Sequence, residues 1–181
     1  NMYSRFTRSK NNMNTINVNP VVRKKIKKLS WMFFDVDGIL TDGSLFFSES
    51  GESLKKFNVL DGHGIKQLLN YGINVGLISS RDHLATRLRA KELGISVLML
   101  KVQSKLKAFE KWSKNIDVDP ARCGHMGDDI PDLELFKKVG FSATVPNACE
   151  EIKSVADLVT TKLGGNGAVR EICDLIIKVN E

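Results

Sequence analysis

From Trp31 to the end of the chain, short apolar runs alternate with longer segments in which apolar residues recur every three or four positions. Short runs are typical of buried strands, and the longer period is typical of amphipathic helices. Their alternation predicts β-α units around a parallel sheet. The predicted strands are 31–34, 74–78, 97–100, 123–126, 141–144 and 158–160, and the predicted helices are 64–71, 82–93, 104–114, 131–139, 148–155 and 169–179.

Two further β-prone runs, 45–47 and 54–57, follow the first strand and flank a polar, glycine-containing segment at 48–52. This pattern predicts a β-hairpin inserted before the first helix. Its apolar residues could pack on the domain's own core or form a subunit contact. The fold class predicted is therefore α/β: a doubly wound, Rossmann-like parallel sheet with an inserted β-hairpin and no large cap domain.

Charge is unevenly distributed along the 181 residues, which carry a net charge of +6. Residues 1–30 hold eight basic residues and no acidic one, so residues 31–181 hold 19 basic and 21 acidic residues. A nucleic-acid or membrane partner favours a basic face on the folded domain, so this distribution argues against both. We predict a basic, flexible leader over 1–30 and a single domain over 31–181.

The cysteines and the apolar runs indicate where the protein resides. Cys123, Cys149 and Cys173 lie far apart, with no Cys-x-x-Cys pair and no histidine at zinc-ligand spacing. Sparse cysteines are typical of a reduced compartment. No apolar run approaches the ~20 residues that cross a bilayer, and no apolar central stretch marks a secretory signal. We therefore expect a cytoplasmic protein.

Polar residues that could carry chemistry follow four successive predicted strands. Each of these residues alone is common in turns, helix caps or solvated surfaces. The strand ends that carry them, however, all meet at one edge of a doubly wound sheet. Crowded carboxylates need a cation, and oxygen ligands suit Mg²⁺ better than zinc. The residues are Asp35 and Asp37, then Ser79 and Arg81, then Lys105, then Asp128 and Asp129.

Such a set suits phosphoryl transfer. A hydroxyl and an ammonium beside a metal can neutralise the oxygens of a transferring phosphoryl group. A carboxylate can act as nucleophile and form an acyl phosphate. A second carboxyl must then protonate the leaving oxygen and later activate water. Asp35 and Asp37, two residues apart after the first strand, supply such a pair.

Two motifs resemble those of haloacid dehalogenase superfamily phosphatases. The resemblance covers essentially all of residues 31–181. Residues 33–43, Phe-Phe-Asp-Val-Asp-Gly-Ile-Leu-Thr-Asp-Gly, resemble the first motif, and 127–132, Gly-Asp-Asp-Ile-Pro-Asp, resemble the acidic fourth motif. Within the superfamily, three segments resemble the 3-deoxy-D-manno-octulosonate 8-phosphate (KDO 8-phosphate) phosphatases. These are 56–57, 61–65 and, most specific, Gly-Gly-Asn-Gly-Ala-Val-Arg-Glu at 164–171.

The resemblance implies a role for each matching residue. It implies Asp35 as nucleophile, Asp37 as acid and base, and Mg²⁺ held by Asp35, Asp128 and the backbone carbonyl of Asp37. Ser79 and Lys105 would bind the phosphoryl group. Asp129 would bind the metal or orient Lys105, and Asp132 would support the ligands from behind. Gly43, Arg170 and Arg81 would contact the substrate, and Arg81 would bind the carboxylate of a sugar acid.

The sequence also departs from the subgroup. Ile-Ser-Ser-Arg at 78–81 replaces Ile-Thr-Gly-Arg, and Leu-Lys-Val at 100–102 replaces a Gln-Gly pair, so Lys101 or Lys107 could compete with Lys105. Pro131 stands where Asn is usual. None of these changes removes a group that hydrolysis requires. The glycines of 164–167 could also form only a mobile turn. The three histidines, His63, His83 and His125, are expected to be structural.

The function that the resemblance implies is Mg²⁺-dependent hydrolysis of KDO 8-phosphate in lipopolysaccharide biosynthesis. The alternatives are a phosphatase for a nine-carbon ulosonate 9-phosphate of the N-acylneuraminate type, a non-catalytic assembly module, and a receiver-like module. A receiver needs its acceptor aspartate after the third strand, where this chain has Lys101.

Without a cap domain, another element must cover the site. The resemblance implies a homotetramer in which the hairpin at 45–57 walls a neighbouring active site and residues 164–170 close over the opening. The alternative is a monomer whose hairpin packs on itself.

Overall fold

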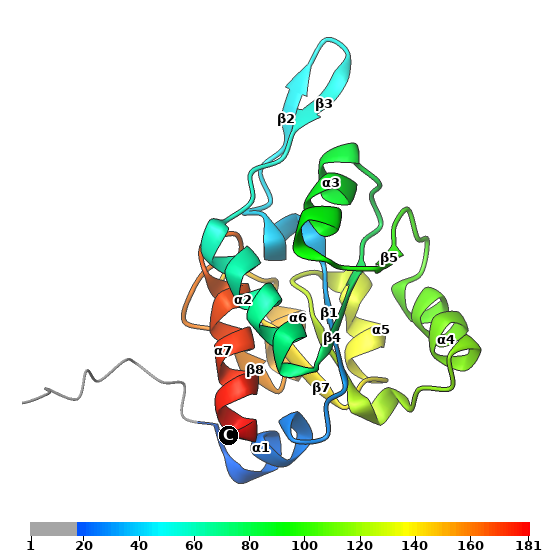
Figure 1. Ribbon diagram of the computed structural model, residues 1–181. Helices are drawn as coiled ribbons and strands as arrows, with labels where there is room; N and C mark the ends of the chain where they lie inside the picture. Colours follow the sequence, from blue (N-terminus) through cyan, green and yellow to red (C-terminus); the bar gives the residue numbers. More distant parts are fainter. Residues whose placement is uncertain (1–17) are drawn as a thin grey trace, which may run out of the picture.

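A six-stranded parallel sheet with helices on both faces forms the body of the protein (Figure 1). The computed structural model describes residues 18–181. The strands of the sheet are β1 (Trp31–Phe34), β4 (Asn74–Ile78), β5 (Val97–Met99), β6 (Cys123–Met126), β7 (Phe141–Thr144) and β8 (Leu158–Val159). The helices are α1 (Pro20–Ile26), α2 (Val59–Tyr71), α3 (Leu84–Leu93), α4 (Lys105–Asn115), α5 (Leu133–Phe136), α6 (Glu150–Val155) and α7 (Ala168–Asn180).

The strand order, β5-β4-β1-β6-β7-β8, confirms the predicted doubly wound topology. The chain runs outward from β1 through β4 to β5, then returns to place β6 on the other side of β1. In such sheets ligands bind at the carboxyl ends of the strands beside this reversal. All six predicted strands are present, and β5 and β8 each end one residue earlier than predicted.

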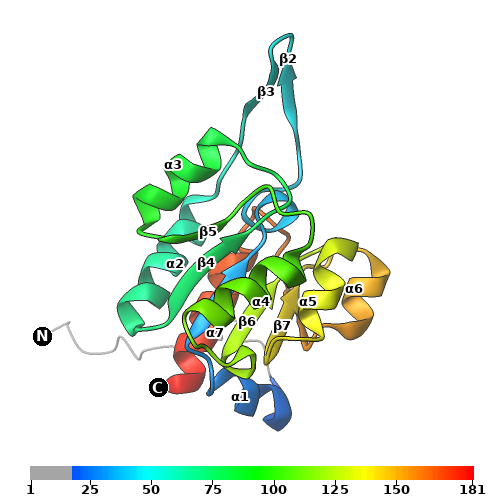
Figure 2. The ribbon, with the colours of Figure 1, turned by 90° about the vertical axis from the view of Figure 1, so that its right-hand side faces the viewer.

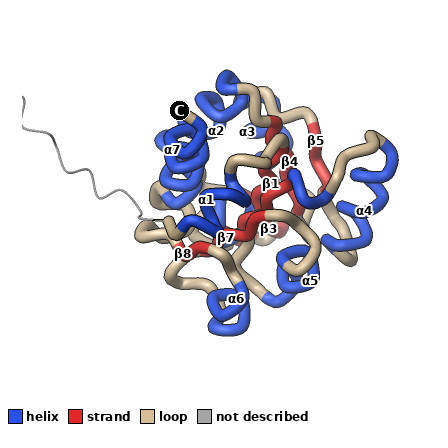
Figure 3. Tube along the Cα trace, turned by 90° about the horizontal axis from the view of Figure 1, so that it is seen from below, coloured by secondary structure: helices blue, strands red, loops and turns tan. Residues whose placement is uncertain are grey.

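Helices α1, α2, α3 and α7 cover one face of the sheet, and α4, α5 and α6 cover the other (Figure 3). Alternation along β1 sends successive side chains to opposite faces. Met32 and Phe34 join the larger buried cluster, which includes residues of α1, α2 and α7. Phe33 joins the smaller buried cluster and packs edge to face on Trp112 of α4, with 4.7 Å between the ring centroids.

Helix α1 lies within the segment predicted to be a flexible leader, and the structure corrects that boundary. The Asn19 side chain accepts a hydrogen bond from the Val22 N–H at 2.9 Å and so caps the helix. Val22 and Ile26, four residues apart on one helical face, are buried in the core. The domain therefore begins before residue 20, and the rest of the predicted leader, residues 1–17, lies outside the described residues.

The inserted hairpin projects well away from the body (Figures 1 and 2). Its strands are β2 (Phe46–Ser48) and β3 (Gly51–Leu54), which pair antiparallel with Phe46 opposite Leu54. The prediction of a second strand over 54–57 is wrong, because the turn is shorter and the strand begins at Gly51. After Leu54 the chain leaves the hairpin and returns to the body.

Capping side chains shift several helix boundaries from those predicted. Helix α2 begins at Val59 rather than at 64 because the Asn58 side chain accepts a hydrogen bond from Leu60 N–H at 2.7 Å. His83, not Asp82, caps α3. The predicted helix over 131–139 is a single 3₁₀ turn followed by the four-residue α5. Between residues 18 and 181, no helix has both the length and the apolarity to cross a membrane.

Candidate active site

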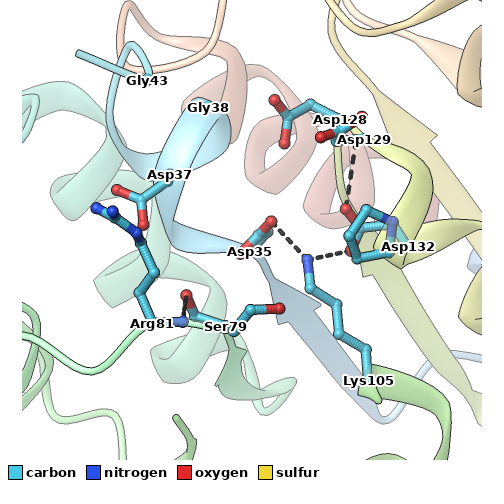
Figure 4. Close-up of a pocket in the computed structure, with 12 residues that line it drawn as sticks. Asp35, Asp37, Gly38, Gly43, Ser79, Arg81, Lys105, Asp128, Asp129 and Asp132 are labelled. Atoms are coloured by element: carbon cyan, nitrogen blue, oxygen red, sulfur yellow. Dashed lines mark hydrogen bonds and ion pairs between the residues drawn. The ribbon is translucent and has the colours of Figure 1, made fainter. Parts of the chain in front are cut away.

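A cleft of about 350 Å³ opens at the carboxyl edge of the sheet (Figure 4). It collects side chains from the ends of β1, β4 and β6 and from the start of α4, as the strand-end pattern predicted. Its lining residues are Asp35, Asp37, Gly38, Gly43, Ser79, Ser80, Arg81, Lys105, Asp128, Asp129, Pro131 and Asp132. Of the predicted site residues, Arg170 is the one that does not line this cleft.

Asp35 is the first residue after β1 and is fixed from both sides. Its backbone N–H donates to the Met126 carbonyl at 2.9 Å, which continues the ladder with β6. One carboxylate oxygen accepts from the Val36 N–H at 2.6 Å, and the other accepts from Lys105 Nζ at 2.5 Å. Burial raises the pKa of Asp35 to about 6, against the opposing effect of Lys105. A buried carboxylate held in one orientation suits a nucleophile.

Lys105 connects Asp35 to a second buried carboxylate. Ser104 caps α4, so Lys105 begins the helix and its ammonium lies 2.6 Å from Asp132 Oδ1 as well as beside Asp35 (Figure 4). Burial disfavours the ammonium, but the two carboxylates outweigh it and raise the pKa of Lys105. Lys101 and Lys107 are exposed and do not line the cleft.

His125 supports this arrangement from β6. Its Nε2 lies 2.6 Å from Asp132 Oδ1, and both side chains are fully buried. Burial alone would raise the pKa of Asp132, but hydrogen bonds and charge from His125 and Lys105 lower it to about 2. Asp132 is therefore an ionised acceptor, and His125 Nε2 donates to it. His125 was expected to be structural. Its place near the end of β6, shortly before the acidic motif, was the signal for a site role.

Asp128 and Asp35 form the acidic part of the cleft. With Asp132 they offer oxygens that all lie within 4.8 Å of one another. Burial first, then the charges of Asp35 and Asp132, raise the pKa of Asp128 to about 7. Gly38 permits the approach, because a Cβ there would lie 2.0 Å from Asp128 Oδ2. Hard oxygen ligands at this spacing fit Mg²⁺, and Asp132 is already engaged by Lys105 and His125, so Asp35 and Asp128 are the favoured carboxylate ligands.

A second set of ion pairs holds the opposite wall of the cleft, around Asp37. Lys55 Nζ lies 2.5 Å from Asp37 Oδ1 and 2.9 Å from Glu52 Oε1. The other oxygen of Glu52 accepts from Arg81 at 2.9 Å. Lys55 and Glu52 were not predicted at the site, since Lys55 pairs with Asp37 across 18 positions and Glu52 pairs with Arg81 across 29. The Arg81 backbone N–H donates to Ser79 Oγ at 3.2 Å.

The glycine-rich segment at 164–167 packs against the loop that carries the site. Gly165 N–H donates to the Ile39 carbonyl at 2.8 Å, and a Cβ at Gly164 would lie 1.7 Å from the Gly38 carbonyl oxygen. Only glycine allows this approach, so the segment is a packed support and not merely a mobile turn.

Asp61 of α2 holds the start of α7, where Arg170 lies. Buried Asp61 accepts from the backbone N–H groups of Gly167 at 3.3 Å and Arg170 at 2.8 Å. The Arg170 guanidinium bonds Asp174 of the same helix at 2.7 Å, and Arg170 does not line the cleft. A substrate contact for Arg170 therefore stays a prediction.

Comparison with known proteins identifies the family. A family model for haloacid dehalogenase-like hydrolases matches residues 95–172. The "3-deoxy-D-manno-octulosonate 8-phosphate phosphatase KdsC" of Salmonella typhimurium is 38% identical over 160 residues, which cover 88% of this chain and 85% of that protein. The chain belongs to the KdsC family of haloacid dehalogenase-like hydrolases. The KdsC of Haemophilus influenzae is 36% identical over 87% of each chain.

Solved KdsC-family structures share the fold. The KDO 8-phosphate phosphatase of Moraxella catarrhalis, in complex with a magnesium ion, a phosphate ion and KDO, has a TM-score of 0.85 and 41% identity over 87% of this chain and 91% of that one. The cobalt-bound enzyme of Haemophilus influenzae has a TM-score of 0.83 and 36% identity, over 86% and 91%. The predicted family resemblance and fold class are thus confirmed, and the chain is a phosphoric monoester hydrolase by family.

Proposed function

We propose that this chain is a Mg²⁺-dependent phosphatase that hydrolyses KDO 8-phosphate to KDO and inorganic phosphate, as its KdsC relatives are named for doing. The observation that carries the proposal is the buried Asp35 carboxylate, held by Lys105 at 2.5 Å beside Asp128. A nucleophile, a cation for phosphoryl oxygens and a carboxylate for a metal are the parts that phosphoryl transfer needs. The family relatives favour the eight-carbon substrate over a nine-carbon one.

In the first half of the reaction, a carboxylate oxygen of Asp35 forms a bond to phosphorus while the bond from phosphorus to the sugar oxygen breaks. Asp37 gives its carboxyl proton to that leaving oxygen. The Lys105 ammonium and the Ser79 hydroxyl bind the phosphoryl oxygens. Mg²⁺, when held by Asp35, Asp128 and the Asp37 carbonyl, would neutralise further phosphoryl charge.

In the second half, Asp37 takes a proton from a water molecule whose oxygen attacks phosphorus. The bond between phosphorus and Asp35 breaks, and inorganic phosphate is released. Asp132 keeps the Lys105 ammonium in place during both halves, and Asp129 caps the turn that carries Asp132. Each residue thus ends the cycle in its starting protonation state.

Arg81 supports recognition of the sugar acid. It follows β4, lines the cleft and has a 42% exposed side chain, so its guanidinium can reach a carboxylate that enters from solvent. Gly43 also lines the cleft, on the chain segment leading to the hairpin. Both would contact the part of the substrate that lies away from the phosphate.

A homotetramer in the cytoplasm is part of the same proposal. The hairpin stands clear of the body, so its apolar residues are not buried there. Phe47 and Leu54 are each 65% exposed. Apolar groups on a projecting hairpin favour contact with another subunit. Light scattering tests this: we expect a tetramer that Phe47→Ser weakens, and a fully active monomer at assay concentration would contradict it.

Phosphate release from a panel of sugar phosphates tests the activity itself. The panel includes KDO 8-phosphate and nine-carbon ulosonate 9-phosphates, each with Mg²⁺ and after chelation. We expect the highest kcat/KM for KDO 8-phosphate, loss of activity on chelation and recovery with Mg²⁺. Preference for a nine-carbon substrate would overturn the substrate assignment, and full activity after chelation would overturn the metal assignment.

A further inference from the structure

The Lys55 side chain lies at the foot of the hairpin and reaches the carboxyl that the proposed function uses as acid and base. We propose that Lys55 is a positioning residue that fixes Asp37 for proton transfer to the leaving oxygen. This inference rests on the proposed role of Asp37. It assigns to the hairpin segment a part in catalysis within its own subunit, separate from any contact with a neighbour.

Lys55 is held as a buried charge must be. Its side chain is 1% exposed, and its ammonium lies 2.5 Å from Asp37 Oδ1 and 2.9 Å from Glu52 Oε1. A buried ammonium is costly unless carboxylates pair with it, so both partners stabilise this one position. Glu52 is on β3 and Lys55 directly follows that strand, so the hairpin carries both residues to the cleft.

Asp37 depends on this contact for its orientation. It lies in the turn after β1, where its own backbone is non-helical. Its Oδ2 is buried and has no hydrogen-bond partner among the described residues, whereas its Oδ1 is bonded by Lys55. One oxygen is thus anchored and the other keeps its hydrogen-bonding capacity, in a carboxyl that lines the cleft. An acid must be held within hydrogen-bonding reach of the leaving oxygen to act.

Glu52 extends the arrangement to the residue proposed to bind the substrate carboxylate. Its Oε2 accepts from Arg81 Nη1 at 2.9 Å, while Oε1 accepts from Lys55. The foot of the hairpin therefore holds both Asp37 and Arg81. We call the part of the cleft that these two residues line the leaving-group side. Any test of Lys55 must separate its effect on Asp37 from an effect transmitted through Glu52 to Arg81.

Leaving-group chemistry distinguishes a positioning role from a merely structural ion pair. A sugar alkoxide is a poor leaving group and needs a proton as the bond to phosphorus breaks, whereas 4-nitrophenolate leaves without one. For both substrates kcat/KM reports the steps up to departure of the leaving group. Misplacing Asp37 should therefore lower kcat/KM for the sugar phosphate far more than for 4-nitrophenyl phosphate.

The experiment compares Lys55→Met with Lys56→Met. Lys56 is the matched control, because it is the neighbouring lysine and also pairs with an aspartate, Asp42, at 2.5 Å, but its side chain is 56% exposed. We expect Lys55→Met to lower kcat/KM for KDO 8-phosphate about tenfold or more, and for 4-nitrophenyl phosphate less than about threefold. Lys56→Met should leave both values near wild type, and Lys55→Arg should restore part of the loss.

Two further measurements complete the test. The selective loss should persist when Lys55→Met is combined with Arg81→Ala, which removes transmission through Glu52. Thermal unfolding checks that each variant is folded, and Lys55→Gln replaces Lys55→Met if the latter is not. Equal losses on both substrates, or wild-type values for a folded Lys55 variant, would overturn the inference.

Asp37→Asn separates this inference from the function on which it rests. If Asp37→Asn hydrolyses the sugar phosphate at the wild-type rate, the proposed role of Asp37 is wrong. If Asp37→Asn is inactive while the folded Lys55 variants match wild type on both substrates, the role of Asp37 stands and only the role of Lys55 is overturned.

Discussion

The two walls of the cleft are built in different ways. On the side proposed to bind the phosphoryl group, which we call the phosphate side, Asp35, Lys105 and Asp132 are buried, and Lys105 bonds both carboxylates. These three residues follow β1, β5 and β6 along the chain. On the leaving-group side, Asp37 and Arg81 have side chains 22% and 42% exposed and are held through two residues of the hairpin segment.

This difference separates attack on phosphorus from the handling of the leaving group. The parallel strands place the residues of the phosphate side, so the proposed nucleophile Asp35 and Lys105 are positioned by the sheet itself. The leaving-group side depends on an insertion that is not part of the sheet, and inserted loops can change without disturbing a scaffold. The following predictions break one wall or the other, beginning with the largest effect.

Asp35→Asn breaks the phosphate side at its centre. An amide of nearly the same shape cannot attack phosphorus, so we expect phosphate release to fall at least about 10³-fold. Phosphate release from KDO 8-phosphate measures the loss, and an unchanged unfolding transition shows that the fold is kept. Turnover near wild type would show that Asp35 is not the nucleophile.

Asp37→Asn breaks the leaving-group side while the phosphate side stays intact. Loss of a general acid and base should lower kcat for the sugar phosphate at least about 10²-fold. Rapid-quench measurement of the phosphorylated enzyme locates the block. With 4-nitrophenyl phosphate, which needs no acid, the aspartyl phosphate should form and then persist; its rapid hydrolysis would contradict the role of Asp37 as base.

Arg81→Ala tests selection without removing the chemistry. Loss of a cation that binds the substrate carboxylate should raise KM for KDO 8-phosphate about tenfold, while KM for 4-nitrophenyl phosphate changes little. Steady-state kinetics on both substrates measures the two effects. Equal increases would place Arg81 on the phosphoryl group or in a structural role.

The smallest effect predicted is that of Asp128→Asn on the metal-free stability of the protein and its dependence on pH. The pKa of Asp128 is raised to about 7 from 3.8, so the folded state holds the proton more tightly than the unfolded state. The contribution of Asp128 to metal-free stability must therefore fall as pH rises from about 4 to 7, and this loss remains above pH 7. The variant removes this loss, so its melting temperature without metal should exceed that of wild type by several degrees at pH 8.

The same variant should show much less gain near pH 4, where Asp128 is protonated in the folded state and about half protonated in the unfolded state. Added Mg²⁺ should reverse the order at pH 8, because wild type binds the ion more tightly and is stabilised by it. Melting curves at the two pH values, with and without Mg²⁺, test the sign. A gain at pH 4 equal to that at pH 8 would contradict it.

Local pattern determined the sheet and most of the phosphate side. The six apolar runs predicted the strands, since a buried parallel strand is apolar along its length. Asp35 and Asp128 could be placed at the site because they follow such runs by one and two residues, and the strand ends of this fold converge whatever the helices do. The limits of α2 and β3 were missed, because Asn58 and the short turn before Gly51 outweighed the apolar pattern.

The contacts between distant segments were decided only by the tertiary structure. The pair of Lys55 with Asp37, the pair of His125 with Asp132 and the approach of Gly164 to Gly38 join residues whose spacing along the chain carries no periodic signal. Helix α1 was predicted to be part of a leader because its basic residues dominate its composition, yet two apolar side chains are enough to pack it on the core. Sequence pattern thus determines which face or strand end a residue occupies. Which distant residue it contacts depends on how the elements pack in three dimensions.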